Sequence, residues 1–95
     1  GGQRIELWLL WAHTVWSLED PQGCILVLEE ALVLYDNHPE LNLRMAVAQH
    51  AVQNLSQASF YLEKAGKDSS MLALAQTAFP YFWTSQWTQT HWLGH

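Results

Sequence analysis

The sequence predicts an all-α protein, and three observations lead to this prediction. Nearly half of the 95 residues are apolar, so the chain is too hydrophobic to be disordered and suits one small folded domain. Apolar residues recur every three or four positions, as they do on the buried face of a helix. Proline follows a capping residue at Asp20-Pro21 and at His38-Pro39, while Asn-Gly and similar hairpin dipeptides are scarce.

The first helix is expected over residues 3–19, and it is apolar on two sides. One face carries, at helical spacing, Ile5, Trp8, Leu9, Ala12, Val15 and Trp16. The second face carries Leu7, Leu10, Trp11 and Leu18. A helix that is apolar on two sides is expected to lie between two neighbours. Trp8 and Trp11 are therefore expected in the core.

Four further helices are expected over residues 22–36, 39–53, 56–65 and 69–84. Asp20 is expected to cap the second helix, and Pro21 is expected at its first position. The N–H that proline lacks would have no hydrogen-bond partner within the helix there. His38 stands before the third helix in the same way. Gly66 ends the fourth helix, because glycine adopts left-handed backbone without strain. Pro80 predicts a kink or an early end in the fifth helix.

The chain repeats itself with a period of 34 residues. Shifting the sequence by this distance aligns Glu6 with Glu40, Leu7 with Leu41, Leu9 with Leu43, Ala12 with Ala46, Leu28 with Leu62, Glu29 with Glu63, and Ala31 with Ala65. This is the length of a unit of two antiparallel helices joined by a tight turn. The period predicts two such units, over residues 5–38 and 39–72.

The two units resemble tetratricopeptide repeats in their order of large and small residues. The positions that carry the resemblance are Trp8, Trp11, Ala12, Cys24, Leu28 and Ala31 in the first unit and Asn42, Met45, Ala46, Ala58, Leu62 and Ala65 in the second. Val15 and Gln49 depart from the tyrosine of the family's pattern, and Asn42 replaces a large residue. Residues 1–72 thus hold two units, and residues 73–95 resemble a partial third unit or a capping helix with an aromatic tail.

The first unit is also similar to half-a-TPR repeats, which occur in RNA-processing scaffolds. Leu7-Trp8-Leu9-Leu10-Trp11-Ala12 and Glu29-Glu30-Ala31-Leu32 carry this second resemblance. The second unit lacks the tryptophan, so the sequence leaves both families open. Either one implies the same fold, a right-handed solenoid of helical hairpins with about two and a half units.

The resemblance implies a concave groove that holds a peptide or helix of a partner protein. The positions that match groove positions include Leu9, His13, Trp16, Leu43, Arg44, Val47 and His50. Trp16 and Val47 also suit the core, and His13 and His50 lack a third ligand for a metal. The expected function is therefore that of a non-catalytic adaptor in a larger assembly. The alternative is a segment that caps or oligomerises a longer helical-repeat scaffold.

The C-terminal stretch is rich in aromatic residues and has no charged residue other than histidine. From Ser69 onward no Asp, Glu, Lys or Arg occurs, and the tail contains Phe79, Phe82, Trp83, Trp87 and Trp92. These side chains are expected to cap the last repeat, to dock on a partner or a second copy, or to lie at a membrane interface. The absence of lysine and arginine argues against an anionic membrane.

Charge and motifs exclude several other classes of function. The net charge is −5, and the four basic residues are scattered, which disfavours direct nucleic-acid binding. No phosphate-binding loop, nucleophile elbow or zinc-protease motif occurs, so neither catalysis nor a cofactor or metal is expected. The lone Cys24 forms no internal disulfide and is expected in the core. The compartment stays open, with a soluble intracellular protein expected ahead of a secreted one.

Overall fold

The computed structural model describes residues 3–93, and this part of the chain is built from helices without any strand, which confirms the all-α prediction. The helices are α1 (Gln3–Ser17), α2 (Pro21–Leu34), α3 (Pro39–Ala51), α4 (Leu55–Ala65), α5 (Ser69–Ala78), α6 (Pro80–Thr84) and α7 (Gln86–Thr88), followed by a π-helical turn, η1 (Gln89–Leu93). Residues 1–2 and 94–95, at the outer ends of the predicted segments 1–72 and 73–95, lie outside the described residues.

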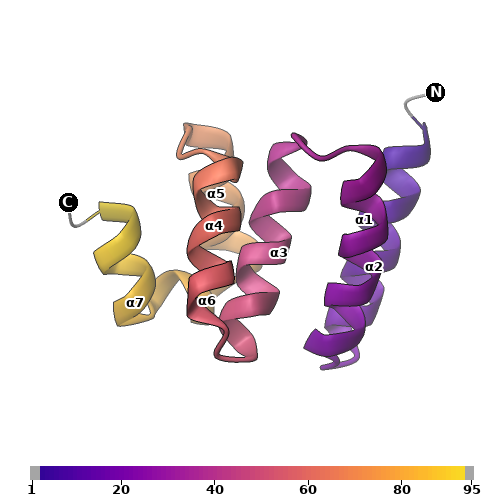
Figure 1. Ribbon diagram of the computed structural model, residues 1–95. Helices are drawn as coiled ribbons and strands as arrows, with labels where there is room; N and C mark the ends of the chain where they lie inside the picture. The colour runs from indigo at the N-terminus through magenta and orange to yellow at the C-terminus, as the bar shows by residue number, and fades with distance from the viewer. Residues whose placement is uncertain (1–2, 94–95) are drawn as a thin grey trace.

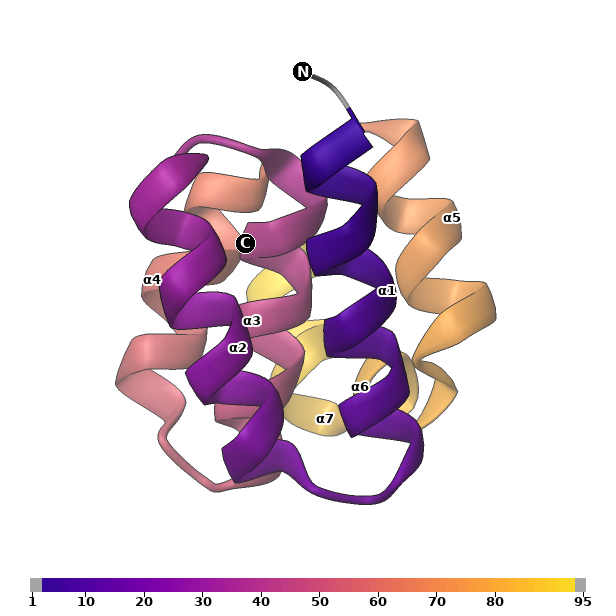
Figure 2. The same ribbon diagram turned by 90° about the vertical axis from the view of Figure 1, so that its right-hand side faces the viewer.

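Helices α1 to α4 pack side by side in chain order, and α5 packs on α3 and α6 rather than on α4, so that α3 lies in the middle (Figure 1). The hairpin of α1 and α2 forms one end of the molecule, and α4 to α7 form the other. Viewed along this direction, α1 and α5 lie to one side of α3 and α2 and α4 to the other (Figure 2). Helix α3 contacts α2, α4, α5 and α6, so it links the two ends.

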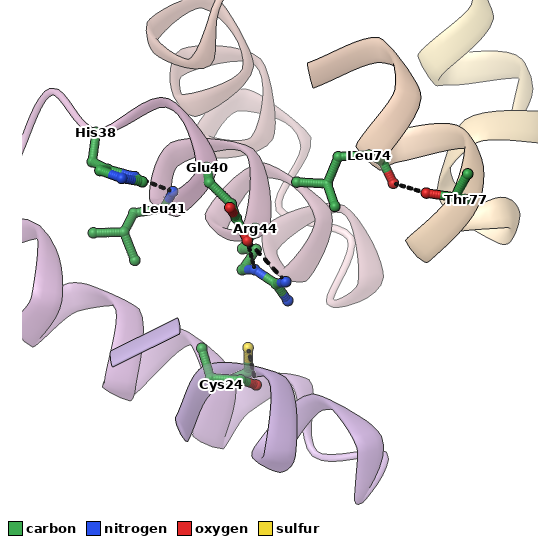
Figure 3. Close-up of polar contacts among 8 residues, drawn as sticks. Cys24, His38, Glu40, Leu41, Arg44, Leu74 and Thr77 are labelled. Atoms are coloured by element: carbon green, nitrogen blue, oxygen red, sulfur yellow. Dashed lines mark hydrogen bonds and ion pairs between the residues drawn. The ribbon is translucent and has the colours of Figure 1, made fainter. Parts of the chain in front are cut away.

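Side chains cap four of the helices at their N-termini, and the cap of the short α7 is Ser85, whose Oγ accepts from the Thr88 N–H at 3.2 Å. The Asp20 carboxylate accepts a hydrogen bond from the Gly23 N–H at 2.9 Å, and Pro21 is the first residue of α2. His38 Nδ1 accepts from the Leu41 N–H at 3.4 Å at the start of α3 (Figure 3). The Asp68 carboxylate accepts from the Met71 N–H at 2.9 Å and starts α5. The predictions for Asp20 and His38 are confirmed.

Helices α1, α2 and α3 each end two residues earlier than predicted, α2 at Leu34 rather than at residue 36. Beyond α1 and beyond α3 a residue adopts left-handed backbone. Helix α1 ends at Ser17 rather than at residue 19, and Glu19 has a φ of 60°. Helix α3 ends at Ala51 rather than at residue 53, and Gln53 has a φ of 66°. Gly66 has a φ of 80° after α4, as the sequence predicted.

The helix predicted over residues 69–84 is divided at Phe79. Helix α5 ends at Ala78, and Pro80 is the first residue of α6. Phe79 lies between them with a φ of −132° and a ψ of 61°, outside the helical region. Proline has no N–H to donate to the helix before it, so the early end expected at Pro80 is confirmed.

The buried side chains form two clusters that meet at α3. The first cluster consists of Ala12, Cys24, Ile25, Val27, Leu28, Ala31, Leu32, Leu41, Met45 and Ala48. The second consists of Leu43, Ala46, Val47, Leu62, Ala65, Met71, Ala75, Phe79, Phe82 and Trp92. Trp16 and Tyr61 are partly buried against both. Helix α3 therefore buries two faces, one toward each cluster.

Residues 34 positions apart occupy equivalent buried places in the two hairpins. The buried pairs are Ala12 and Ala46, Cys24 and Ala58, Leu28 and Leu62, and Ala31 and Ala65. Small residues at three of these pairs allow neighbouring helices to approach closely. The equivalence fails on the outer side of α1, where Leu7 and Trp11 are exposed although Leu41 and Met45 are buried.

Asn42, the departure from the large residue of the repeat pattern, fixes the connection between α2 and α3. Its side chain is fully buried, and Nδ2 donates to the carbonyl of Asp36 at 3.0 Å and to that of His38 at 2.9 Å. A large apolar side chain could not make these bonds. The asparagine thus stabilises the bend that starts the second hairpin.

Cys24 is expected to resist alkylation in the folded protein. Burial raises the pKa of its thiol to about 11, so almost none is ionised at about pH 8, and Sγ lies 3.5 Å from the Ala12 carbonyl oxygen (Figure 3). We expect no labelling by iodoacetamide over hours under native conditions and complete labelling in urea, followed by mass spectrometry. Rapid labelling without denaturant would contradict this burial.

Candidate functional site

The candidate site is a pocket between the C-terminal ends of α1 and α3 and the junction of α5 with α6. The pocket has a volume of about 270 Å³ and is lined by Trp16, Val47, His50, Ala51, Gln53, Ala78, Phe79, Pro80, Tyr81 and Phe82. We call it the α3–α6 pocket. Its lining is mostly apolar and aromatic, with polar groups on His50, Gln53 and Tyr81 and no Asp, Glu, Lys or Arg.

Trp16 and Phe79 form one wall of the pocket. Their rings meet edge to face, with centroids 5.9 Å apart. The Arg44 guanidinium lies 5.4 Å from the centroid of the Phe79 ring and pairs with Glu40 at 3.0 Å (Figure 3). The break at Pro80 places Phe79 here, because a continuous helix would carry the chain past this point. A cation–π contact and an ion pair therefore hold the arginine beside this wall.

His50 and Phe82 form the opposite wall. The His50 ring meets Phe82 edge to face, with centroids 5.3 Å apart, and Trp87 at the same separation. Burial lowers the pKa of His50 below its usual value, because the charged form loses water. Neutral imidazole is thus favoured among these aromatic rings.

The structure brings together only part of the predicted groove. Trp16, Val47 and His50 line the pocket, whereas Leu9 packs against the first cluster and His13 is exposed away from the pocket. Leu43 is fully buried and Val47 nearly so. Residues of α5 and α6 cover this side of α3. Arg44 faces Phe79 rather than an open groove.

The predicted aromatic tail folds back on its own chain. Phe79, Phe82 and Trp92 are buried in the second cluster, and Trp83 and Trp87 are partly buried against it. Trp83 and Trp92 meet edge to face at 5.4 Å. The Lys67 ammonium donates to the carbonyl of His91 at 3.0 Å, which links η1 to the connection before α5. The tail thus covers the last helices of its own chain, which corresponds to the capping role among those expected for it.

Sequence reasoning missed the rim of the pocket. Ala51, Ala78 and Tyr81 line it and are exposed, and none was a predicted site residue. The signal that could have found them is Pro80, because the predicted break lies within three residues of Ala78 and Tyr81. Tyr81 is 92% exposed, so its ring stands at the mouth of the pocket.

A second candidate surface is the outer side of α1, which we call the outward α1 face: Leu7, Leu10, Trp11, Thr14 and Leu18. All five side chains are exposed, with Leu7 at 65% and Leu18 at 73%. The prediction that neighbours cover both sides of this helix is wrong within residues 3–93. Trp11, expected in the core, stacks on the half-buried Trp8 at 5.4 Å instead.

Within residues 3–93 no three side chains of His, Cys, Asp or Glu gather in a way that could hold a metal ion. No helix in this range combines the length and the apolar character that crossing a bilayer requires.

No family model matches this chain. Likewise, no curated protein and no solved structure is detectably similar to it. The pocket and the outward α1 face therefore have to be interpreted from their own geometry.

We expect the protein to lose stability in mild acid because His50 is partly buried. Since burial lowers its pKa in the folded state, the unfolded chain takes up the proton first as the pH falls below about 6.5, and the free energy of unfolding decreases. Above that pH His50 is neutral in both states and adds no pH dependence. We expect urea denaturation curves between about pH 7.5 and 5 to show a smaller decrease for His50→Gln than for the wild type. Equal decreases would contradict the assignment to His50.

Proposed function

We propose that this chain is a non-catalytic protein-interaction module that binds an apolar segment of a partner protein in the α3–α6 pocket. The observation that carries the proposal is the lining of the pocket, which is aromatic and aliphatic and has no Asp, Glu, Lys or Arg beside its one imidazole group. Burial keeps that group, His50, neutral. Such a surface favours an uncharged apolar side chain over a carboxylate or a phosphate.

The size of the pocket supports a peptide side chain as the ligand. Its volume of about 270 Å³ lies below the range of about 300–1,000 Å³ that is typical of pockets enclosing a small molecule. One or two aliphatic or aromatic side chains suit this space. Tyr81 at the mouth and Gln53 at the edge offer a hydroxyl and an amide to the backbone of the bound segment.

The helical hairpins support the same type of function. Two hairpins with equivalent buried residues 34 positions apart agree with the proposed likeness to tetratricopeptide or half-a-TPR repeats, whose members bind partner peptides and helices. Catalysis finds no support from the one thiol, because the pKa of Cys24 is raised to about 11. Adaptor function in a larger assembly is therefore the proposal.

A pocket-filling substitution tests the proposal. Short random peptides displayed on phage are selected on the immobilised protein, and the affinity of synthetic copies is measured by calorimetry. Ala78→Phe, which places a ring in the pocket, is expected to weaken binding by about tenfold or more. Ala73→Phe is the matched control, because Ala73 is an exposed alanine of the same helix that does not line the pocket.

The outcomes are distinct. Loss of affinity in Ala78→Phe with full affinity in Ala73→Phe supports the pocket as the site. Equal binding by both variants, or selected peptides that carry only charged residues, would overturn the proposal. Circular dichroism of both variants shows whether the helices are intact.

The end of the molecule that the aromatic tail covers, which we call the closed end, favours a second candidate function, the termination of a longer helical array. The aromatic tail covers the second cluster at one end, while the outward α1 face is uncovered at the other. Under this candidate function, Ala78→Phe leaves assembly unchanged, and substitutions on α1 prevent it.

A further inference from the structure

The outward α1 face corresponds to a face that is covered by a helix elsewhere in the chain. The residues that lie 34 positions after Leu7, Trp11, Thr14 and Leu18 are Leu41, Met45 and Ala48 of α3 and Val52, which directly follows α3. The first three are fully buried in the first cluster, to which α2 contributes, and Val52 packs against the same cluster. Leu7, Trp11, Thr14 and Leu18 recur at intervals of four and three, the spacing of a seam between two helices. The occupant that fits this face is a helix.

The two ends of the molecule differ in a way that favours contact between like faces. At the end formed by α5 to α7, the large side chains Phe79, Phe82 and Trp92 are already buried against the second cluster. A head-to-tail stack of copies would place the outward α1 face on this closed end. Contact of α1 with α1 instead buries two exposed apolar stripes at once.

We propose that the outward α1 face is the interface of a two-fold symmetric dimer, in which α1 of one copy packs antiparallel on α1 of a second copy. An antiparallel pair centred between Ala12 and His13 places Leu7 opposite Leu18 of the second copy. The same register places the large Trp11 opposite the small Thr14. A large side chain thus meets a small one at the centre of the seam, where the two helices come closest, and leucine meets leucine at both ends.

The charges at the ends of α1 complement each other in this register. Arg4 lies near the start of the helix, and Glu19 and Asp20 follow its end. The antiparallel pair brings Arg4 beside Glu19 and Asp20 of the second copy, whereas a parallel pair would place Arg4 beside Arg4. Within residues 3–93, neither Arg4 nor Glu19 has an oppositely charged partner within 4 Å. The charges therefore select the antiparallel orientation.

The mass of the protein in solution is the first test. Sedimentation equilibrium over micromolar to millimolar concentrations is expected to show a shift from the 10.9 kDa monomer to a dimer. Leu7→Lys with Leu18→Lys is expected to raise the dissociation constant by more than about 100-fold, because four leucines leave the interface. Phe60→Lys on α4 is the matched control, since it also replaces an exposed large apolar residue with lysine and leaves the constant unchanged.

Charge exchange tests the register itself. Arg4→Glu and Glu19→Arg are each expected to weaken the dimer about three- to tenfold, because each homodimer then brings like charges together. Mixing the two variants restores pairing, since one chain then carries acids and the other bases at both positions. Native mass spectrometry of the mixture, with one variant isotopically labelled, measures the fraction of mixed dimer.

Dimers that form preferentially between the two charge variants support the proposal. A wild type that stays monomeric to about millimolar concentration would overturn it. So would a dimer that survives the two lysine substitutions, or mixed and unmixed dimers in statistical proportion. Each of these results leaves the α3–α6 pocket and its peptide-binding test unaffected.

Discussion

Replacing Phe82 with alanine is expected to lower the free energy of unfolding by about 3–5 kcal/mol, the range for loss of a buried phenylalanine. Phe82 is 4% exposed and belongs to the second cluster. Its ring also contacts the rings of His50, with centroids 5.3 Å apart, and Trp87, with centroids 6.3 Å apart, so its removal deletes two aromatic contacts between α3 and the tail or within the tail. Domains of this size are stable by about 5–15 kcal/mol, so the variant approaches the limit of folding.

Tyr81→Ala is the matched control for this substitution. Tyr81 is the preceding residue of the same short helix, but its side chain is 92% exposed, so its removal is expected to change stability by less than about 0.5 kcal/mol. Urea denaturation followed by circular dichroism measures both variants. Equal losses in the two would show that the tail does not lie on the second cluster as described.

Leu28→Ala is expected to lower the free energy of unfolding by about 2–5 kcal/mol. Leu28 is fully buried in the first cluster, where it belongs to the face of α2 that also carries Cys24 and Ala31. Removal of its side chain leaves a cavity between α2 and its neighbours, and the surrounding helices can close it only in part. The measurement is again urea denaturation, at a pH near 7.5 so that His50 is neutral in both states.

The control for Leu28 lies on the other side of the same helix. Leu26 is 64% exposed, and Leu26→Ala is expected to change the free energy of unfolding by less than about 0.5 kcal/mol. The two substitutions delete the same atoms from one helix, so the difference between them measures burial alone. A larger loss for Leu26 than for Leu28 would mean that α2 is rotated relative to this structure.

Local chemistry in the sequence predicted most of the fold. Asp20 and His38 start helices because their side chains accept backbone N–H groups, and Pro80 ends one because it has no N–H. The early ends of α1 and α3 could not be predicted in this way. Glu19 and Gln53 adopt positive φ, which these residue types rarely do, so only the packing around them determines where α1 and α3 stop.

The candidate site was predicted in pieces. Trp16, Val47 and His50 were assigned to a groove and Phe79 and Phe82 to a tail, and the structure joins these five residues in one pocket. Periodicity within a helix does not reveal which distant segment covers it. The sequence could therefore identify the second apolar face of α1 but not that this face is exposed.

The position of α3 between the two clusters has a consequence for how the molecule opens. Leu41 and Met45 face the first cluster, and Leu43 and Val47 face the second. Local unfolding of either half would therefore expose one buried side of α3 to solvent. Amide hydrogens of α3 are therefore expected to exchange with deuterium only through global unfolding, and most slowly in the chain. The amide hydrogens of η1, at the edge of the molecule, should exchange through a local opening that has a lower free energy than global unfolding. Exchange rates would thus divide the molecule by distance from α3 and not by hairpin.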